Sequence, residues 1–311
     1  MRLGIDLGGT KIEIVALDDS GRERLRHRIA APRDDYAATL EAIVELVDSA
    51  ERELGTRGTV GIGTPGALSR RTGLLKNSNS VWLNGRPIRN DLQQRLEREV
   101  RIANDANCFA LSEAMDGAGR DAEVVFGVIL GTGCGGGIVV DRRVLTGVNA
   151  IAGEWGHNPL PLPTAGDLPL PPCYCGKSGC NELYISGTGL ARDHRAATGQ
   201  ALTALQIVSA SASGDEAALA STERYEERLA RALSTVINIV DPDVIVLGGG
   251  MSNLTRLYES VPRLWSRTIT SDHVDTRLVR NRHGDSSGVR GAAWLWGADA
   301  HVSETRVMAD A

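Results

Sequence analysis

The chain has 311 residues, of which 42% are hydrophobic and 23% are charged, and these values are typical of a globular protein with a sizeable core. Lys and Arg number 34 against 39 Asp and Glu, which leaves a net charge of −5 and no basic surplus to neutralise a nucleic acid backbone. No apolar run reaches the roughly 18 to 20 residues of a membrane span, and the first strand-like segment already begins at Leu3. We therefore expect a cytoplasmic protein without nucleic acid or membrane partners.

Two similar glycine-tipped segments occur at residues 3–17 and 126–140. Each consists of an apolar run, a turn of glycine and threonine, and a second apolar run, which predicts a hairpin. Their spacing is too long for a solenoid repeat. We therefore expect two related domains, at 1–120 and 121–300, each beginning with a hairpin.

The segments between and after the hairpins alternate between helix and strand patterns. Apolar spacing predicts helices at 36–54, 91–99, 106–115, 217–240, 259–268 and 291–296, and short apolar runs predict strands at 60–63, 100–103 and 244–247. This alternation favours α/β domains with largely parallel sheets. Six of the eleven prolines lie between Pro159 and Pro172, so we expect an extended surface loop there. Residues 301–311 lack periodicity and are expected to form a loose tail.

Two of the glycine turns are candidate phosphate sites. Asp6 is followed by the glycines and threonine of 7–11, whose backbone N–H groups and hydroxyl could hold a phosphate while Asp6 holds a metal ion on it. A plain hairpin would explain one such turn equally well, but the second, at 131–133, favours convergence of both on one polyphosphate. Neither turn has the Walker pattern, and no GxGxxG follows a strand, which argues against P-loop and Rossmann sites. A third glycine turn, at 248–250, could hold an adenine ring or could simply begin a helix.

Asn104 and Asp105 lie where a short strand is followed by a helix, a place where α/β proteins commonly bind substrates. Asp105 is therefore a candidate general base that would deprotonate a sugar hydroxyl as the hydroxyl attacks a γ-phosphoryl group. Simple helix capping is the alternative, and one residue could do both.

Four residues with soft or borderline ligand atoms lie close together in the sequence: His157, Cys173, Cys175 and Cys180. Such a set suits tetrahedral Zn²⁺, and the absence of an open position predicts a structural site in a loop at 157–180. Glu154 and Glu182 flank this loop. Their carboxylates could accept hydrogen bonds from sugar hydroxyls.

Seven short segments together resemble the ROK family, named for repressors, open reading frames and kinases. They are DLGGTK at 6–11, GTPG at 63–66, NDAN at 104–107, GTGCGGG at 131–137, GEWGH at 153–157, CYCGKSGCNE at 173–182 and LGGG at 247–250. The resemblance extends from about Leu3 to Trp296. Within the family, NSVWL at 79–83, EWGHNPLP at 154–161 and the segment 283–296 are most similar to bacterial fructokinases that also accept mannose.

The resemblance implies a two-domain α/β fold of the actin, hexokinase and ribonuclease H type, with a duplicated βββαβα core and an active site in the cleft between the domains. It implies a fructokinase, a phosphotransferase that moves the γ-phosphoryl group of ATP to the 6-hydroxyl of D-fructose, with Mg²⁺ and structural Zn²⁺ as cofactors. It also implies a homodimer. ROK glucokinases and N-acetylglucosamine kinases share the same carboxylates and cysteines and are the alternative.

The resemblance also implies roles for particular positions. Asp105 takes the position of the catalytic base. The implied ATP contacts are Gly4, Asp6, Gly8, Gly9, Thr10, Lys11, Gly131, Thr132, Gly133, Cys134, Gly135, Gly248 and Gly249. The implied sugar contacts are Gly66, Asn79, Asn104, Asp105, Glu154, His157 and Glu182. His157 would bind zinc through one ring nitrogen and sugar through the other. Asn181 departs from the apolar residue that many members have, which bears on local packing.

A non-catalytic sugar sensor is the alternative from another functional class. ROK repressors carry a DNA-binding helix-turn-helix before the kinase-like body, whereas here the first phosphate turn lies almost at Met1. An intact Asp105 together with both phosphate turns favours an enzyme. Selectivity among hexoses is expected to depend on the loop at 79–84 and on Asn158.

Overall fold

The computed structural model describes residues 1–297, and these form two compact units. The first, the N-terminal unit, consists of Met1–Cys108, Val148–Ala150 and, among the described residues, 288–297. The second, the C-terminal unit, consists of Phe109–Gly147 and Ile151–Ser287. This grouping is discontinuous along the chain, whereas the sequence suggested contiguous domains with a boundary near residue 120. The tail predicted at 301–311 lies outside the described residues.

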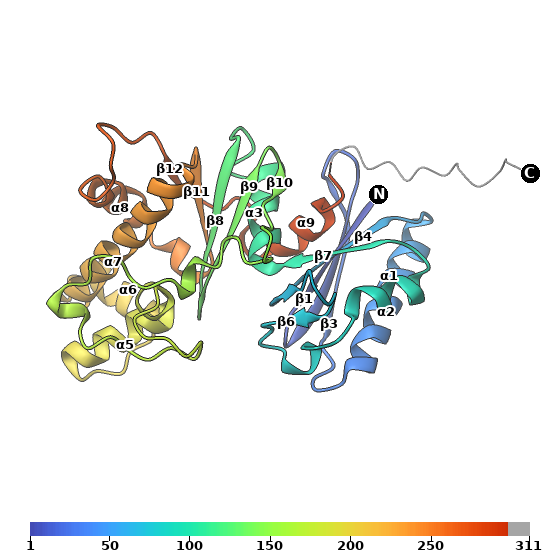
Figure 1. Ribbon diagram of the computed structural model, residues 1–311, viewed down its shortest axis with the longest axis horizontal. Helices are drawn as coiled ribbons and strands as arrows, with labels where there is room; N and C mark the ends of the chain where they lie inside the picture. The colour runs from blue at the N-terminus through green and yellow to red at the C-terminus, as the bar shows by residue number, and fades with distance from the viewer. Residues whose placement is uncertain (298–311) are drawn as a thin grey trace, which may run out of the picture. The chain divides into compact units, whose positions relative to one another are not determined.

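A five-stranded sheet forms the centre of the N-terminal unit, in the order β3-β2-β1-β4-β7. β1, β2 and β3 pair antiparallel, and β4 and β7 continue the sheet in parallel to β1. Helices α1 and α2 pack against each other and cover one face of it (Figure 1). The bounds are β1 Arg2–Leu7, β2 Lys11–Leu17, β3 Glu23–Ala30, α1 Tyr36–Leu54, β4 Thr59–Thr64, β5 Ala67–Leu68, β6 Leu75–Lys76, α2 Ile88–Leu96 and β7 Val100–Asn104, with α9 at Ser287–Trp294. Helix α3, Asp105–Met115, begins in this unit and belongs to the other unit from Phe109 onward.

The C-terminal unit repeats the same sheet topology in the order β10-β9-β8-β11-β12. Its first three strands pair antiparallel, and β11 and β12 continue in parallel to β8. The bounds are β8 Val124–Leu130, β9 Cys134–Val140, β10 Arg143–Val144, α4 Glu182–Ile185, α5 Gly187–Thr198, α6 Ala204–Ala212, α7 Glu216–Val240, β11 Val244–Gly248, α8 Leu257–Trp265 and β12 Arg277–Arg280. Single-turn 3₁₀ helices lie at Val81–Leu83, Trp155–His157, Ala165–Asp167, Gly250–Asn253 and Gly284–Ser286. The matching topology explains why both hairpins have similar sequences.

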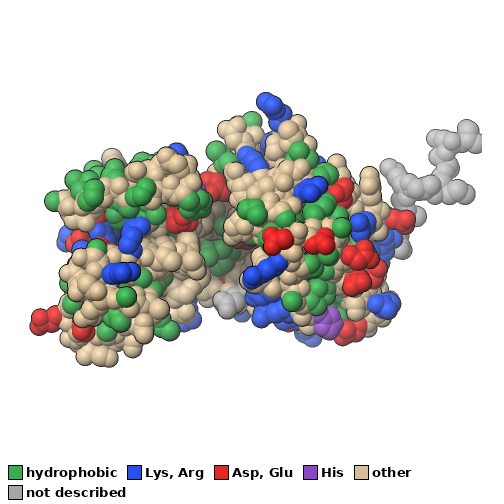
Figure 2. Space-filling view, turned by 90° about the horizontal axis from the view of Figure 1, so that it is seen from below, with side chains coloured by type: hydrophobic (Ala, Val, Ile, Leu, Met, Phe, Trp, Pro, Cys, Tyr) green, Lys and Arg blue, Asp and Glu red, His purple; other side chains and the backbone are tan. Residues whose placement is uncertain are grey.

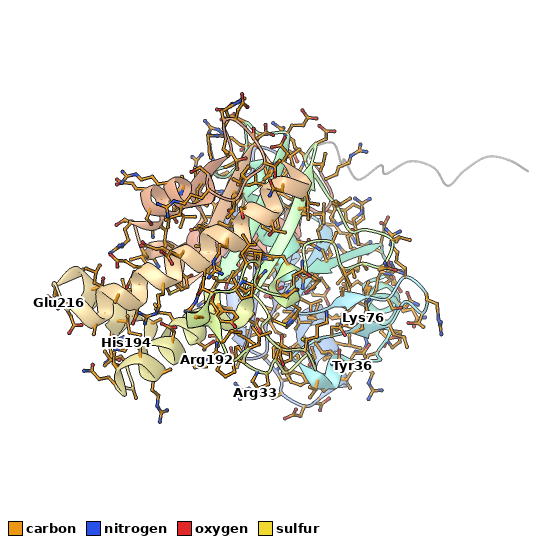
Figure 3. All side chains as sticks on the ribbon, turned by 60° about the vertical axis from the view of Figure 1, so that its left-hand side comes forward. Arg33, Tyr36, Lys76, Arg192, His194 and Glu216 are labelled. Atoms are coloured by element: carbon orange, nitrogen blue, oxygen red, sulfur yellow. The ribbon has the colours of Figure 1, made fainter. Side chains whose placement is uncertain are left out.

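Each unit has its own hydrophobic core. In the N-terminal unit, the periodic apolar face of α1, with Ile43 and Val47, packs on fully buried strand residues such as Ile5 and Ile62. In the C-terminal unit, α7 is in contact with α5, α6 and α8. His194, labelled in Figure 3, belongs to α5 and is buried. Its Nδ1 lies 2.9 Å from the Ser221 hydroxyl of α7.

Two glycines of the N-terminal sheet are required by the close approach of α9. A Cβ at Gly61 would lie 1.9 Å from the carbonyl oxygen of Ala292, and one at Gly4 would lie 2.2 Å from that of Val289. No side chain can be accommodated at these distances. The sheet therefore accepts α9 only because both positions lack a side chain.

Several predicted elements begin and end elsewhere. The helix predicted at 91–99 spans Ile88–Leu96, because Glu97 has a left-handed backbone with φ 51° that ends it. The helix predicted at 259–268 spans Leu257–Trp265, and the one predicted at 291–296 spans Ser287–Trp294. The stretch 159–172 is only partly a surface loop, since it buries Leu160 and Asp167.

No helix among the described residues is long and apolar enough to cross a lipid bilayer.

Acidic and basic side chains lie next to one another on the face shown in Figure 2. This mixed distribution agrees with the small net charge of −5.

Candidate functional site

The four residues predicted to bind zinc converge in the C-terminal unit. The ligand atoms of His157, Cys173, Cys175 and Cys180 all lie within 4.8 Å of one another. Cys173 Sγ is 3.6 Å from His157 Nδ1, and Cys175 Sγ is 3.6 Å from Cys180 Sγ. Donors around a tetrahedral zinc ion are about 3.3 to 3.8 Å apart. The residues therefore fit Zn²⁺ as a structural ion.

A tight backbone turn presents the cysteines. The Cys173 amide donates to the Lys177 carbonyl over 2.7 Å, and the Gly176 amide donates to the Cys173 carbonyl over 3.0 Å. Gly176 and Gly179 have φ of 86° and 73°, a region that favours glycine. The backbone conformation of the loop therefore explains both glycines without a contact to a ligand.

The second ring nitrogen of His157 is also paired. Its Nε2 lies 3.0 Å from the hydroxyl of Tyr174, and the two rings meet edge to face with centroids 5.1 Å apart. Partial burial of that hydroxyl, together with the negative charges of Glu182, Cys173 and Glu154, raises the pKa of Tyr174 to about 12. Tyr174 therefore stays protonated at neutral pH. No local sequence pattern had marked this residue as functional.

Glu182 and the second glycine turn are in direct contact. The Glu182 carboxylate accepts a hydrogen bond of 3.0 Å from the Cys134 amide. A Cβ at Gly133 would lie 2.6 Å from the same carboxylate oxygen, so a side chain there would displace the carboxylate. A candidate phosphate turn and a candidate sugar ligand, 48 residues apart in the sequence, therefore adjoin.

The segment that carries Glu154 and His157 packs on strand β9. The Trp155 indole donates to the Gly135 carbonyl over 3.3 Å, and a Cβ at Gly136 would collide with the same indole at 2.6 Å. Asn181 is buried, and its side-chain amide donates to the Trp155 carbonyl over 3.0 Å. Asn181, the departure noted in the sequence, thus ties this segment to the zinc loop.

An apolar cavity of about 730 Å³ begins at the Gly131-Thr132 turn. The Thr188 hydroxyl donates to the Thr132 carbonyl over 2.7 Å, and the Gly187 amide donates to the Gly131 carbonyl over 2.8 Å. The remaining lining comes from Ala191, Thr203, Ala204, Leu205, Val208, Gly250, Met251, Asn253 and Leu254. Such a lining suits a flat heteroaromatic ring.

The third glycine turn reaches this cavity only through Gly250. Gly248 packs on the Phe109 ring, where a Cβ would lie 2.4 Å away, and Gly249 has φ 78°. The turn then enters a 3₁₀ helix, Gly250–Asn253. Both glycines are thus explained by packing and backbone conformation, and their contact with ATP stays a prediction.

In the N-terminal unit, Asp105 is the first residue of α3. Its Oδ1 accepts a hydrogen bond of 2.8 Å from the Ala106 amide, which also lies 2.9 Å from the side-chain oxygen of Asn104. Burial, followed by the charges of Asp105 and Asp6, raises the pKa of the Cys108 thiol. Both carboxylates therefore lie near Cys108, Asp6 close to the carboxyl end of β1 and Asp105 directly after β7.

Asp6 lies at the end of β1, opposite Glu13 and Gly63 in the sheet register. Burial raises its pKa, and the charge of Lys11 opposes this only in part. A buried carboxylate of this kind is stabilised in its charged form by an added cation. The role of Asp6 as the ligand of a divalent ion stays a prediction.

The remaining sugar candidates lie on either side of the β5–β6 hairpin, Gly66 directly before β5 and Asn79 in the loop after β6. Gly66 has φ 82° and lies against the Lys76 carbonyl, and its own carbonyl accepts a 3.1 Å bond from Asn104. Asn79 is exposed. Asn84 braces this loop by accepting from the amide of Ser78 and donating to its carbonyl, at 2.9 and 2.8 Å.

The predicted residues therefore form two groups. The N-terminal unit carries Gly4, Asp6, Gly8, Gly9, Thr10, Lys11, Gly66, Asn79, Asn104 and Asp105. The C-terminal unit carries Gly131, Thr132, Gly133, Cys134, Gly135, Glu154, His157, Cys173, Cys175, Cys180, Glu182, Gly248 and Gly249. Gly4 is buried inside β1 against α9, so packing already explains it.

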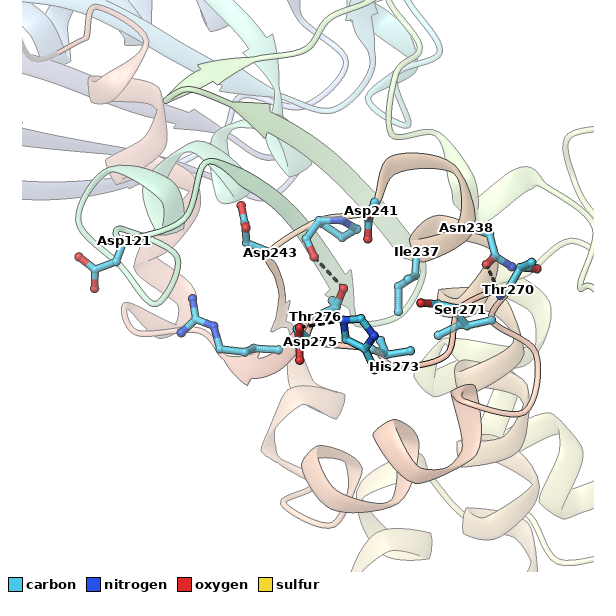
Figure 4. Close-up of a pocket in the computed structure, with 14 residues that line it drawn as sticks. Asp121, Ile237, Asn238, Asp241, Asp243, Thr270, Ser271, His273, Asp275 and Thr276 are labelled. Atoms are coloured by element: carbon cyan, nitrogen blue, oxygen red, sulfur yellow. Dashed lines mark hydrogen bonds and ion pairs between the residues drawn. The ribbon is translucent and has the colours of Figure 1, made fainter.

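A second cavity, of about 770 Å³, lies in the C-terminal unit and is lined by loops after α7 and before β12 (Figure 4). Its acidic residues include Asp241, Asp243 and Asp275. Asp243 accepts hydrogen bonds from the amides of Glu123 and Val124 at 3.0 and 2.7 Å, so it closes a loop. None of the site residues predicted above, all within the described chain, lines this cavity.

Comparison with known proteins decides the family. The model of the ROK family matches residues 2–299. The chain belongs to the ROK family. It is a sugar kinase of this family, with the actin-like sugar kinase fold.

Two kinds of relative illustrate this membership. The N-acetyl-D-glucosamine kinases of Salmonella newport (strain SL254) and Salmonella gallinarum (strain 287/91 / NCTC 13346) are 42% and 43% identical to this ROK protein, over 95% of its chain and 99% of theirs. The crystal structure of a ROK hexokinase from Thermus thermophilus has a TM-score of 0.84 at 32% identity, covering 94% of this chain and 97% of that one. A ROK glucokinase from Streptomyces griseus, crystallised with glucose and AMPPNP, has a TM-score of 0.72 at 27% identity, covering 94% and 98%.

These names bear out the sugar kinase expectation but not its finer form. The relatives at 42–43% identity are named N-acetyl-D-glucosamine kinases, the second interpretation of the sequence rather than the first. The preference for fructose rested on three short segments, and it is not supported.

Proposed function

We propose that this ROK protein is an ATP-dependent N-acetyl-D-glucosamine kinase that transfers the γ-phosphoryl group to the 6-hydroxyl of the sugar. We choose this sugar because the chain is 42–43% identical, over 95% of its length, to proteins named N-acetyl-D-glucosamine kinase. The fructokinases were favoured by segments that together span a small part of the sequence.

Asp105 would act as the general base. Its carboxylate is oriented by the 2.8 Å bond from the Ala106 amide, and a carboxylate held in this way can accept the proton of the 6-hydroxyl as that oxygen attacks phosphorus. Asn104, beside it, would bind the sugar together with Gly66 and Asn79.

Glu154 and Glu182 would bind further sugar hydroxyls. A carboxylate only accepts hydrogen bonds, and sugar hydroxyls can donate them. The contact of Glu182 with the Cys134 amide fixes the carboxylate beside the second glycine turn. This contact supports a common role in binding the two substrates.

The nucleotide would occupy the glycine turns and the adjoining cavity. Gly131 and Thr132 belong both to the turn and to the lining of the cavity of about 730 Å³. Leu205 of that lining is 79% exposed, which an adenine ring would cover. The amides and hydroxyl of residues 8–11 would contact the phosphates.

Two ions would complete the site. Mg²⁺ would neutralise charge on the phosphates when bound, and Asp6 is the residue that would hold it. Zn²⁺ on His157 and the three cysteines would be structural, since four protein ligands leave no open position.

The test is an ADP-release assay with Mg-ATP against N-acetylglucosamine, glucose, mannose and fructose. We expect kcat/KM for N-acetylglucosamine to exceed that for each of the others by at least tenfold, because a site that hydrogen-bonds one group rejects analogues lacking it. A preference for fructose would restore the interpretation first drawn from the sequence. Binding of a sugar without turnover of any would favour the non-catalytic sensor.

A further inference from the structure

A buried carboxylate, Glu13, lies close to the first glycine turn and has no role in the function proposed above. Only 2% of its side chain is exposed, although it lies on β2 just two residues after Lys11. Glutamate is rarely buried to this extent unless it is paired. The residues around Glu13 therefore bear on what it does.

The sheet register places Glu13 on the same face as two residues that are predicted to act at the nucleotide. Glu13 is directly opposite Asp6 of β1, and directly opposite residues share one face of a sheet. Lys11 lies two positions before Glu13 on β2, so it lies on that face as well. Arg28 of β3 is directly opposite Glu13 from the other neighbouring strand. One face of the sheet therefore carries all four charged residues next to the turn.

Three cations surround the Glu13 carboxylate. Arg28 donates to Oε2 through Nε and Nη2 over 3.1 and 2.8 Å, and Arg26 donates to Oε1. The two arginines thus already bind both oxygens. The Lys11 ammonium lies 3.5 Å from Oε2 in addition. Glu13 therefore does not need Lys11 as a partner, and the contact matters chiefly for the position of the lysine.

The contact restrains Lys11 without using up its donors. An ammonium group has three N–H donors, so one directed at Glu13 leaves two for a ligand. The Lys11 side chain is 39% exposed, which leaves it within reach of one. Its carbonyl accepts the Gly8 amide over 3.0 Å, so its backbone already belongs to the turn. Glu13 therefore orders a long side chain whose ordering would otherwise oppose binding.

We propose that Glu13 is a positioning residue that holds the Lys11 ammonium beside the first glycine turn, where Lys11 binds the phosphates of ATP. Arg26 and Arg28 offset the charge of Glu13, which would otherwise repel the phosphates. The inference rests on the proposed function, because that function makes Lys11 a nucleotide contact.

Glu13→Gln tests this, because glutamine keeps the size of the side chain and removes its charge. We expect the calorimetric Kd of Mg-AMPPNP and the KM for Mg-ATP to rise about three- to tenfold, since Lys11 must then be ordered during binding. The kcat and the KM for the sugar should change less than about twofold. Loss of a negative charge near a polyphosphate would by itself lower the Kd. The direction of the change therefore separates positioning from repulsion.

Glu51→Gln is the matched control. Glu51 of α1 is another carboxylate of the N-terminal unit that is paired with an arginine, Arg98, at 2.5 and 2.9 Å. Neither Arg98 nor its other partner, the Gly58 amide, is a predicted nucleotide contact. The control should lose stability but keep the wild-type KM for Mg-ATP.

A second variant combines Glu13→Gln with Arg26→Gln. It keeps the net charge and removes one of the arginines that Glu13→Gln leaves without a counter-charge, so it remains informative where the single variant is too unstable to purify. The Kd of Mg-AMPPNP should rise in it as in Glu13→Gln, because Lys11 again lacks its restraint.

Lys11→Met shows whether Glu13 acts through the lysine. In a Lys11→Met background, Glu13→Gln should change the Kd of Mg-AMPPNP by less than about twofold, because no ammonium is left to position. An effect of Glu13→Gln that persists in full in this background would overturn the proposal. An unchanged or lower Kd in Glu13→Gln, or an equal rise in Glu51→Gln, would overturn it too.

The proposed function fails in a distinguishable way. Wild-type protein that binds no Mg-AMPPNP, or a Lys11→Met variant with the wild-type Kd, would refute the nucleotide site itself and the role of Glu13 with it. Weak binding in Lys11→Met, combined with a wild-type Kd in Glu13→Gln, would refute only the role of Glu13.

Discussion

The position of Asp105 at the first residue of α3 makes its two predicted roles compatible. One carboxylate oxygen accepts the Ala106 amide over 2.8 Å, which satisfies a backbone donor at the helix start. The same bond fixes the direction of the carboxylate. Helix capping and general-base catalysis, which the sequence left as alternatives, can therefore be properties of one side chain.

Asp105→Asn separates these roles. Asparagine keeps an oxygen for the Ala106 amide but cannot take up a proton, so kcat should fall about 10²- to 10⁴-fold while the melting temperature and the sugar Kd stay near wild type. Steady-state kinetics and calorimetry provide the measurement. Asp121→Asn, at an exposed carboxylate, is the control and should keep full activity. Near wild-type turnover in Asp105→Asn would exclude the general-base role.

The proline-rich stretch is fastened to helix α7 by a buried ion-pair network. Asp167 accepts hydrogen bonds from Arg228 Nε at 2.7 Å and from Arg231 Nη2 at 2.9 Å. A third comes from the Thr164 amide at 2.7 Å. This anchoring orders a segment whose composition alone favours irregular structure. It also holds the chain between the two parts of the zinc site.

The pKa of Asp167 makes this anchor sensitive to acid. Burial would raise the pKa, but the Thr164 amide and the two arginines outweigh it and lower the pKa to about 2. A carboxyl whose pKa is lower in the folded state contributes stability above its unfolded pKa of about 4, and this contribution is lost as the pH falls toward 2. Acid should therefore release the loop from α7.

Asp167→Asn should cost on the order of 3 kcal/mol at pH 7, because it leaves buried arginines without their counter-charge. The difference from wild type in urea unfolding should shrink as the pH falls from about 4 toward 2. Glu259→Gln, at an exposed pair with Arg263, is the control and should change stability by less than about 0.5 kcal/mol. A cost in Asp167→Asn that does not depend on pH would contradict the electrostatic explanation.

The zinc loop is the element whose order should depend on a metal. Elemental analysis of the purified protein should find about one zinc per chain, and Cys180→Ser should lose the ion and melt at a lower temperature, because the remaining ligands hold it less tightly. A strong chelator should lower the melting temperature of wild type in the same way. Cys108→Ala, at a buried cysteine of the other unit, should keep its zinc. Zinc-free wild-type protein with unmodified thiols would refute the site.

At the scale of the whole molecule, one strand topology occurs twice. Each sheet has three strands joined antiparallel and two added in parallel, and each has a separate hydrophobic core. The similar hairpins at 3–17 and 126–140 are therefore the local sign of a duplicated fold. The ROK family model, which matches residues 2–299, extends over both copies.

The sequence by itself determined the features that depend on local periodicity and spacing. Both hairpins and the helix at 36–54, whose bounds are those of α1, were predicted because apolar spacing and glycine turns are properties of neighbouring residues. The cysteine spacing likewise predicted a cluster with His157, and the four ligand atoms do converge. The edge strand β3 was missed because its arginines and glutamate hide the strand pattern.

Only the tertiary structure decided which distant residues meet. Glu182 contacts the Gly133-Cys134 turn, and Tyr174 pairs with His157. The apolar cavity likewise lies between the Gly131-Thr132 turn and α6. No local pattern in the sequence connects the segments that meet in these three places. The first interpretation of the sugar was not supported for a related reason. Hexoses differ in single groups, so the contacts that tell them apart are made by a few side chains brought together by the fold.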